Sequence, residues 1–530
     1  MQDASALQVV VLLGVSVLAL TWLARKIRVA APIVLLVGGV PLAFVPWLAD
    51  VHLPPDIVLL IFLPALLYWE SLNTSLREIR ANLRAVLNDS ILLVLATAGA
   101  VAIAGHAFGL SWPVAWVLGA VVAPTDATAV TAVTAVTGRL PRRQLTMLRA
   151  ESLINDGTAL VVFTIAVQVA TGRGHFGWAG VVGRFALSYV GGAAVGLLVA
   201  WLTARVRKLM HDPLLENTVN LLAPFVAFLL AEEIHASGVL AVVVCGLTLS
   251  QLNPRLVPAR TRVPSRAFWQ LSTFLLNGTL FVLVGLQLRG AVASLVSSSV
   301  PGAVAAAVLV IAVVIGVRLL WMYTIPYLIQ LVDRRPSQRA RRIGARQRLP
   351  LAWCGFRGAV SLAAALAVPV TVADGSPFPG RDLIIFVTFA VILVTLLVQG
   401  LTLPAILRWA RLPTDHGEFA ERQLAERTAA EAGLAALPAV AARLGVSDEA
   451  VERLRAELEE RLADLGDEVE EPSPREDYRR LHAALLPDKR AALVRLRDAR
   501  LIDDIVLRRV QARLDAEEVR LSGALEAESE

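Results

Sequence analysis

The stretch ESLINDGTAL, residues 151–160, places a glutamate, an asparagine and an aspartate inside a long apolar segment. Val161, Val162 and Phe163 follow it directly. Charged side chains at the depth of a lipid bilayer are energetically expensive, and where they occur they usually serve a function. The stretch therefore indicates a membrane-spanning helix that carries a polar site.

The composition of the whole chain agrees with a membrane protein. Of its 530 residues 56% are hydrophobic, and the mean hydropathy is +0.64. These values exclude an ordinary soluble protein. The first apolar run, 7–24, has no basic region before it and no small-residue cleavage site after it, so we expect a retained transmembrane helix. Cys245 and Cys354 lie in apolar segments and are expected to be buried thiols.

Charge divides the chain into two parts. Residues 1–410 carry a net charge of +15, whereas residues 411–530 carry −9. We therefore predict a membrane domain over 1–410 and an acidic, cytosolic, helical domain over 411–530. The basic excess of the first part lies in short loops between apolar runs. It concerns membrane topology and does not indicate nucleic-acid binding.

Apolar runs predict an all-α polytopic fold with about thirteen transmembrane helices. A helix needs about 20 apolar residues to cross the bilayer. The candidates are 7–24, 29–48, 56–73, 87–108, 112–137, 144–170, 178–204, 215–234, 237–250, 266–288, 300–332, 349–372 and 382–408, of which the short ninth could be merged with the eighth.

Basic residues in the loops support this number. Loops after odd-numbered helices hold 23 Lys and Arg residues, and loops after even-numbered helices hold three. Because cytoplasmic loops are enriched in Lys and Arg, we expect the N-terminus outside and the C-terminus in the cytoplasm.

The acidic tail shows helical periodicity. Apolar residues between 451 and 465 recur at spacings of three and four, and Ser447-Asp448-Glu449 is a favourable helix start. The segment EEPSPRED, 470–477, is typical of a linker. A solvated helical hairpin or a dimerising coil would account for this pattern.

The sixth predicted helix carries a compact polar wedge. Ser152 and Asp156 are four residues apart and share one helix face, and Glu151 and Asn155 share the neighbouring face. Carboxylate, hydroxyl and amide oxygens are hard ligands, which suit a small alkali cation better than a soft transition metal.

The fifth predicted helix contains a break. Its sequence APTDATAVTAVTAVTG, 123–138, places Pro124 two residues before Asp126. Proline removes a backbone donor and disfavours continuous helix. Irregular backbone at membrane depth is tolerated where it lines a cavity or is buried in protein, and broken helices of this kind are typical of transporters.

The twelfth predicted helix, with CGFRGAVSL at 354–362, contributes a positive charge. Arg357 lies at mid-membrane depth and needs a negative partner, for which Glu151 is the obvious candidate. Asp156 is then the carboxylate left free to gain and lose a proton. We expect Arg318, by contrast, to lie near an interface and extend its charge toward water.

Taken together, these residues resemble the monovalent cation:proton antiporter family that includes the bacterial NhaP-type and animal sodium/proton exchangers. The resemblance covers most of residues 1–410. Family members usually have proline directly after the aspartate of the fifth-helix motif, where this chain has Ala127. The motifs that carry it are FLPALLYWESLN (62–73), APTDATAV (123–130), ESLINDGTAL (151–160), ASGVLAVVVCGL (236–247), NGTLFVLVGLQL (277–288) and GFRGAVSLAAAL (355–366).

The resemblance implies an inverted-repeat antiporter fold and a homodimer. It implies that Asp156 binds the ion, with Asp126, Thr125, Ser152 and Asn155 as further ion-binding residues. Sodium would be held at Asp156, Asp126, Thr125 and Ser152. It also implies a structural ion pair between Glu151 and Arg357, and a place for Glu70 near the ion pathway. The helix of the second half that mirrors the broken fifth helix could be 349–372 or 382–408.

We therefore expect a sodium/proton antiporter of a bacterial inner membrane that serves pH homeostasis and exchanges one cation for one proton without net charge movement. The partners are a monovalent cation, a proton and the lipid bilayer, and no cofactor is expected. A potassium or broadly selective antiporter is the nearest alternative, and a membrane sensor that signals through its tail is a further one. The chain lacks the motifs of common intramembrane hydrolases, so we expect no enzyme activity.

Overall fold

The computed structural model describes residues 2–45, 58–137, 140–172, 177–210, 212–293, 300–332, 344–412 and 417–464, with single residues and short pieces between 485 and 518. The chain forms two compact units, Met1–Asp415 and His416–Glu530. In the described residues the first unit is made of helices joined by turns and irregular segments, with one isolated bridge between Thr371 and Pro377.

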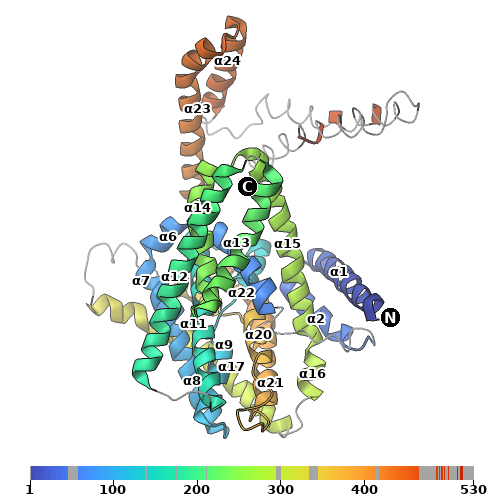
Figure 1. Ribbon diagram of the computed structural model, residues 1–530, viewed down its shortest axis with the longest axis vertical. Helices are drawn as coiled ribbons and strands as arrows, with labels where there is room; N and C mark the ends of the chain where they lie inside the picture. Colours follow the sequence, from blue (N-terminus) through green and yellow to red (C-terminus); the bar gives the residue numbers. More distant parts are fainter. Residues whose placement is uncertain are drawn as a thin grey trace. The chain divides into compact units, whose positions relative to one another are not determined.

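The first unit consists of closely packed helices (Figure 1). They are α1 (Gln2–Ile27), α2 (Ala31–Leu42), η1 (Val58–Phe62), α5 (Leu63–Leu72), α6 (Leu76–Ala81), α7 (Leu83–Leu87), η2 (Asn88–Leu93), α8 (Val94–Ala107), α9 (Trp112–Val122), α10 (Ala127–Thr137), α11 (Arg142–Ala170), α12 (Trp178–Leu209), α13 (Pro213–Glu233), α14 (Gly238–Leu256), α15 (Ala259–Leu286), α16 (Leu288–Ala293), α17 (Val300–Val332), α19 (Ala345–Trp353), α20 (Ala359–Leu366), α21 (Arg381–Val394), η3 (Thr395–Gln399) and α22 (Gly400–Ala410).

Nine helices within the described ranges are long and apolar enough to cross a membrane. Three shorter apolar helices, Ala31–Leu42, Leu59–Leu72 and Gly238–Pro254, accompany them. The all-helical membrane fold is confirmed, whereas the figure of thirteen crossings stays a prediction. The eighth and ninth predicted helices are separate, because a turn with His235 at φ 57° divides α13 from α14.

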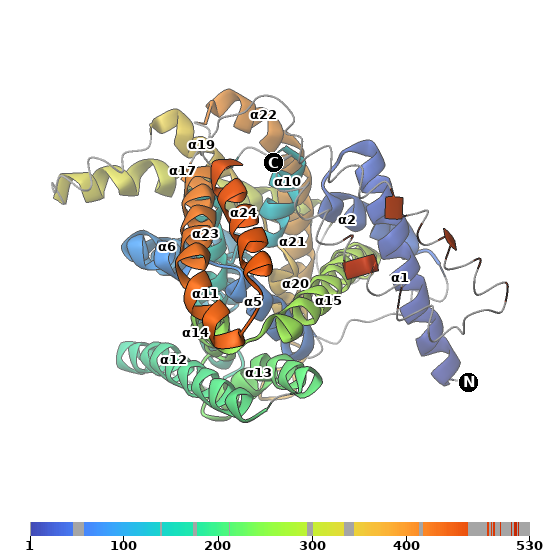
Figure 2. The same ribbon diagram turned by 90° about the horizontal axis from the view of Figure 1, so that it is seen from above.

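The helices of the first unit group into two bundles by their contacts (Figure 2). In the first bundle, α1, α2 and α15 pack together, and α5 packs against α14, which α12 and α13 cover. In the second bundle, α8, α9 and α11 pack together, and α17 and α21 join them along with the short helices α10, α19, α20 and α22.

Small residues let helices of the first bundle approach closely. A Cβ atom at Gly285 would lie 2.1 Å from the carbonyl oxygen of Leu36, and one at Gly39 would lie 2.3 Å from that of Val282. Glycine at both positions therefore permits the crossing of α2 and α15, as in other membrane helix pairs.

The second unit contains a helical hairpin of α23 (Gly417–Leu444) and α24 (Asp448–Asp464), which pack against each other. The helix start expected at 447–449 is confirmed, since α24 begins at Asp448. The predicted linker 470–477 lies outside the described residues.

Candidate functional site

Two broken helices cross at the centre of the second bundle. The break between α9 and α10 covers residues 123–126, as Pro124 predicts, and the break between α19 and α20 covers 354–358. The backbone N–H of Asp126 donates to the carbonyl oxygen of Phe356 at 2.8 Å. The 349–372 helix is therefore the broken counterpart of the fifth, whereas α21, η3 and α22 continue without a break through 381–410.

The crossing depends on Gly358, the residue before α20. A Cβ atom there would lie 1.9 Å from Oδ2 of Asp126, so the carboxylate rests directly against the backbone of the other broken helix. The Oδ1 atom of Asp126 accepts hydrogen bonds from the backbone N–H of Thr128 at 2.8 Å and from its hydroxyl at 2.5 Å. The side chain is thus held from both breaks.

Glu151 pairs with Arg318, and the predicted pair with Arg357 is wrong. Nη1 and Nη2 of Arg318 donate to the two carboxylate oxygens of Glu151 at 2.5 and 3.1 Å. Arg318 comes from α17, is 2% exposed and does not extend to an interface as expected. A two-point Arg–carboxylate contact is a strong, geometrically specific pair.

Arg357 donates hydrogen bonds to backbone carbonyl oxygens in place of a carboxylate. Its Nε donates to the carbonyl oxygen of Val122 at 2.7 Å, and its Nη1 donates to that of Gly355 at 2.6 Å. Val122 is the last residue of α9, where the final carbonyls lack helical partners and carry partial negative charge, and Gly355 lies within the second break. The guanidinium therefore binds the two helix breaks together.

A chain of hydrogen bonds links Glu151 to the first break. Nδ2 of Asn155 donates to Oγ1 of Thr125 at 2.7 Å, and that hydroxyl donates to Oε1 of Glu151 at 3.2 Å. Asn155 lies beside Arg318, Arg357 and Glu151, and its Oδ1 is buried without a hydrogen-bond partner among the described residues. The structure does not bring Asn155 into the cavity that Asp156 lines.

That cavity lies between the two bundles and has a volume of about 50 Å³, enough for a few water molecules. Asp156, which is 5% exposed, and Asp126 line it from the second bundle, and Glu70 lines it from the first. Thr125 and Ser152 also line it, and Oγ of Ser152 accepts a hydrogen bond from the backbone N–H of Ala127 at 3.2 Å. The lining contains no basic side chain, so its formal charge is negative or zero.

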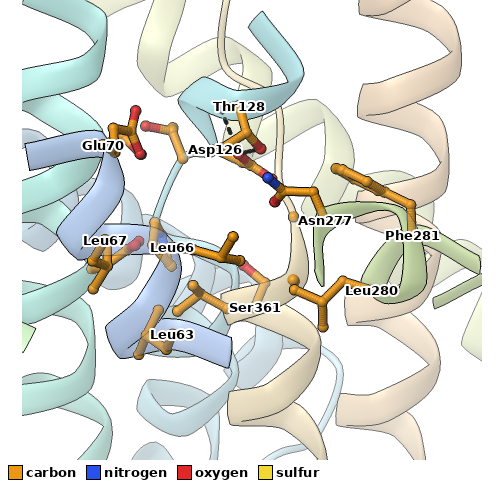
Figure 3. A pocket seen from close by; sticks show the side chains of 17 residues that line it. Leu63, Leu66, Leu67, Glu70, Asp126, Thr128, Asn277, Leu280, Phe281 and Ser361 are labelled. Atoms are coloured by element: carbon orange, nitrogen blue, oxygen red, sulfur yellow. Dashed lines mark hydrogen bonds between the residues drawn. The ribbon is translucent and has the colours of Figure 1, made fainter. Parts of the chain in front are cut away.

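The three carboxylates do not form one tight cluster. In the described part of the chain, no three His, Cys, Asp or Glu side chains lie close enough together to hold a metal ion. Figure 3 shows Glu70, on α5, and Asp126, in the break before α10, near the same end of the cavity. A cation bound here would need oxygen ligands other than carboxylates.

Sequence reasoning missed the partner of Glu151 and three polar side chains of the cavity, one of which is Thr128, whose hydroxyl donates to Asp126. Asn277 of α15 and Ser361 of α20 line the cavity, and Ser361 is 1% exposed with a hydroxyl that has no partner. Asn277 and Ser361 both lie in the motifs given above. A polar residue within an apolar helix could have indicated that each lines the cavity. Arg318 is the one charged residue in the sequence of α17. A charge in such an apolar helix is compatible with a buried ion pair as well as with a position near the membrane interface.

Comparison with known proteins identifies the family of the chain. A sequence model described as "Sodium/hydrogen exchanger, transmembrane" matches residues 13–409. The chain is 48% identical over 530 residues to the uncharacterized Na(+)/H(+) exchanger Rv2287 of Mycobacterium tuberculosis. The match covers 98% of this chain and 97% of the relative. It is 32% identical over 417 residues to the Na(+)/H(+) antiporter ApNhaP of Aphanothece halophytica, which covers 77% of this chain and 75% of that protein.

A solved structure shares the fold. The sodium proton antiporter MjNhaP1 from Methanocaldococcus jannaschii superposes with a TM-score of 0.60 at 19% identity, over 78% of this chain and all of that chain. The match of the family model over most of the membrane unit, together with the extended likeness to named exchangers, is decisive. The chain is a multi-pass membrane protein that belongs to the transmembrane sodium/hydrogen exchanger family.

Proposed function

We propose that the protein is a sodium/proton antiporter in which Asp156 binds a sodium ion and a proton by turns. The observation that carries the proposal is the position of Asp156 in a cavity between the bundles, lined by carboxylate and hydroxyl oxygens and by no basic side chain. Asp126, Ser152 and Thr125 are the further sodium ligands in this proposal, and Glu70 contributes a negative charge from the opposite wall.

The proposed coupling follows from the cost of charge in a membrane. An ionised, empty site is expensive to move through a low-dielectric region, whereas a site neutralised by sodium or by a proton is not. Because Asp156 holds one or the other, movement of sodium in one direction requires movement of a proton in the other. One carboxylate that exchanges one cation for one proton makes the cycle electroneutral.

The place of Asn155 supports the one-for-one ratio. An aspartate at this position would add a second titratable charge next to Asp156 in sequence. The chain has an amide here, which donates a hydrogen bond to Thr125 and does not itself line the cavity. The neighbour of Asp156 therefore takes no part in proton exchange in this proposal.

Access to the two sides of the membrane would alternate by movement of one bundle against the other. The cavity takes its walls from both bundles, and the two crossing breaks lie on one side of it. The breaks are fixed to each other by Asp126, Phe356 and Arg357, so we propose that the second bundle moves as one body.

The direct transport test uses everted membrane vesicles that contain the full chain and a fluorescent indicator of internal pH. Wild-type vesicles should lose an imposed proton gradient when sodium chloride is added, and Asp156→Asn vesicles should not. Glu232→Gln is a matched control, since Glu232 accepts a hydrogen bond from the N–H of Gly238 outside the cavity. Sodium-driven proton movement by Asp156→Asn at the wild-type rate would refute the proposal.

We further propose a homodimer in a bacterial inner membrane, where exchange would serve pH homeostasis. The N-terminus would lie outside and the C-terminal unit in the cytoplasm, as the distribution of Lys and Arg in the loops favours. Single cysteines introduced near each terminus test the orientation, because an impermeant thiol reagent added to intact cells should label the N-terminal site alone.

A further inference from the structure

Asn277 is the one uncharged polar residue that the first bundle contributes to the cavity. That bundle lines the cavity with Leu63, Leu66, Leu67, Glu70, Asn277, Leu280 and Phe281. Figure 3 shows the carboxamide of Asn277 pointing toward Asp126, across the gap between the bundles. No hydrogen bond joins the two residues in the described structure, so the amide is available to a ligand between them.

The composition of the cavity explains what such an amide would bind. The three carboxylates do not converge on one point, so a cation beside Asp156 and Asp126 needs neutral oxygens to complete its shell. An amide oxygen is a hard ligand of the kind alkali and alkaline-earth cations accept. Unlike a fourth carboxylate, it adds a ligand without adding negative charge to a buried site.

We infer that the side-chain oxygen of Asn277 is a ligand of the transported cation, supplied by the bundle opposite Asp156. This inference rests on the proposed exchange at Asp156. Because α15 belongs to the first bundle, the ligand is present only while the bundles keep the arrangement described here. Asn277 therefore sets the apparent affinity for the cation on one side of the membrane, and its loss from the shell accompanies the passage to the other side.

The test compares Asn277→Ala and Asn277→Asp with the wild type and with Thr279→Ala. Thr279 lies two residues further along α15 and outside the cavity lining, so it is a matched control. Two quantities are measured on the full-length protein: the apparent KM for sodium in vesicles, and the sodium concentration that half-maximally raises the thermal unfolding temperature of the purified protein, with choline chloride as the reference salt.

We expect Asn277→Ala to raise both quantities on the order of tenfold, with the maximal rate within about twofold of wild type. Asn277→Asp keeps the shape and an oxygen, so at alkaline pH it should bind sodium at least as well as the wild type and lose affinity more steeply as pH falls. Thr279→Ala should match the wild type.

An unchanged sodium affinity in Asn277→Ala, or an effect on the maximal rate alone, would overturn the inference. If the alanine variant does not fold, a sodium affinity of Asn277→Asp that follows pH as in the wild type would overturn it as well. Asp156→Asn is measured in parallel, to distinguish failure of the Asn277 ligand role from failure of the proposed function. Its inactivity together with a normal Asn277→Ala refutes the ligand role only, whereas its activity refutes the proposed function.

Discussion

The guanidinium of Arg318 holds the carboxylate of Glu151 through two hydrogen bonds, deep among the helices of the second bundle. Both side chains are almost fully buried, with side-chain exposures of 3% and 6%. Thr125 and Asn155 extend this pair to the break between α9 and α10. The pair thus supports the backbone beside the cavity and stays outside the cavity itself.

Removal of Arg318 should destabilise the protein strongly. Arg318→Met leaves the Glu151 carboxylate buried without its partner, which costs about 3–5 kcal/mol. Thermal unfolding of the purified protein should show a large loss of stability, and the double variant with Glu151→Gln should recover part of it. Arg427→Ala breaks an exposed pair with Glu431 and should cost less than about 1 kcal/mol. Equal losses for both arginines would contradict the structural role of the buried pair.

Gly358→Ala should strongly reduce transport. The added Cβ atom would lie 1.9 Å from Oδ2 of Asp126, which forces the two broken helices apart at the site. We expect the sodium-driven rate in everted vesicles to fall at least about tenfold, the factor that a loss of about 1.4 kcal/mol produces. Gly316→Ala, on α17 with open space around the added atom, is the control and should leave the rate unchanged. A fully active Gly358→Ala protein would argue against the crossing as described.

Sodium and protons should compete. If Asp156 holds either ion, lower pH leaves fewer empty sites, and the apparent KM for sodium should rise by up to about tenfold per pH unit while the rate at saturating sodium changes little. Initial rates between pH 6 and pH 9 check this. A KM that does not depend on pH, with a falling maximal rate, would indicate separate sites.

Asp374 is a suitable control for this pH series. It lies in the loop between α20 and α21, where the hydroxyl and the backbone N–H of Ser376 donate to its carboxylate at 2.6 and 2.9 Å. These hydrogen bonds lower the pKa of the Asp374 carboxyl, so the group stays ionised throughout the series. Asp374→Asn should reproduce the wild-type pH profile.

Exchange should not respond to the membrane potential. In proteoliposomes with equal potassium on both sides, valinomycin clamps the potential near zero, and an electroneutral cycle should run at the same rate with and without it. The same vesicles serve for a panel of lithium, sodium and potassium chlorides, which decides between a sodium and a potassium antiporter. A clear change of rate with valinomycin would contradict one-for-one exchange.

The local features of this site follow from its sequence. Pro124 and the polar residues after it predicted the break before α10, because proline removes a helical hydrogen bond whatever its surroundings. The position of Asp156 on a continuous helix, one turn from Ser152, likewise depends on helical spacing alone. Both features appear where the sequence places them.

The pairing of charges does not follow from sequence in the same way. The motifs suggested Arg357 as the partner of Glu151. Helix packing instead brings Arg318 to that carboxylate, and Arg357 donates to the carbonyl oxygens of Val122 and Gly355. Buried charge requires a partner, yet the partner can be a helix end as well as a carboxylate. Asn277 was missed for a related reason, since its access to the cavity depends on the contact between the two bundles.

The central claim is that one carboxylate, Asp156, exchanges a proton for a cation, and proton release on sodium binding tests it most directly. Sodium chloride is added to the purified full-length protein in weakly buffered detergent solution, and a pH indicator reports the protons released relative to choline chloride. At saturating sodium the account predicts release of about half a proton per protein chain for the wild type at the midpoint of its titration, where half of the sites start protonated, and none for folded Asp156→Asn. Proton release by Asp156→Asn equal to that of the wild type would contradict it.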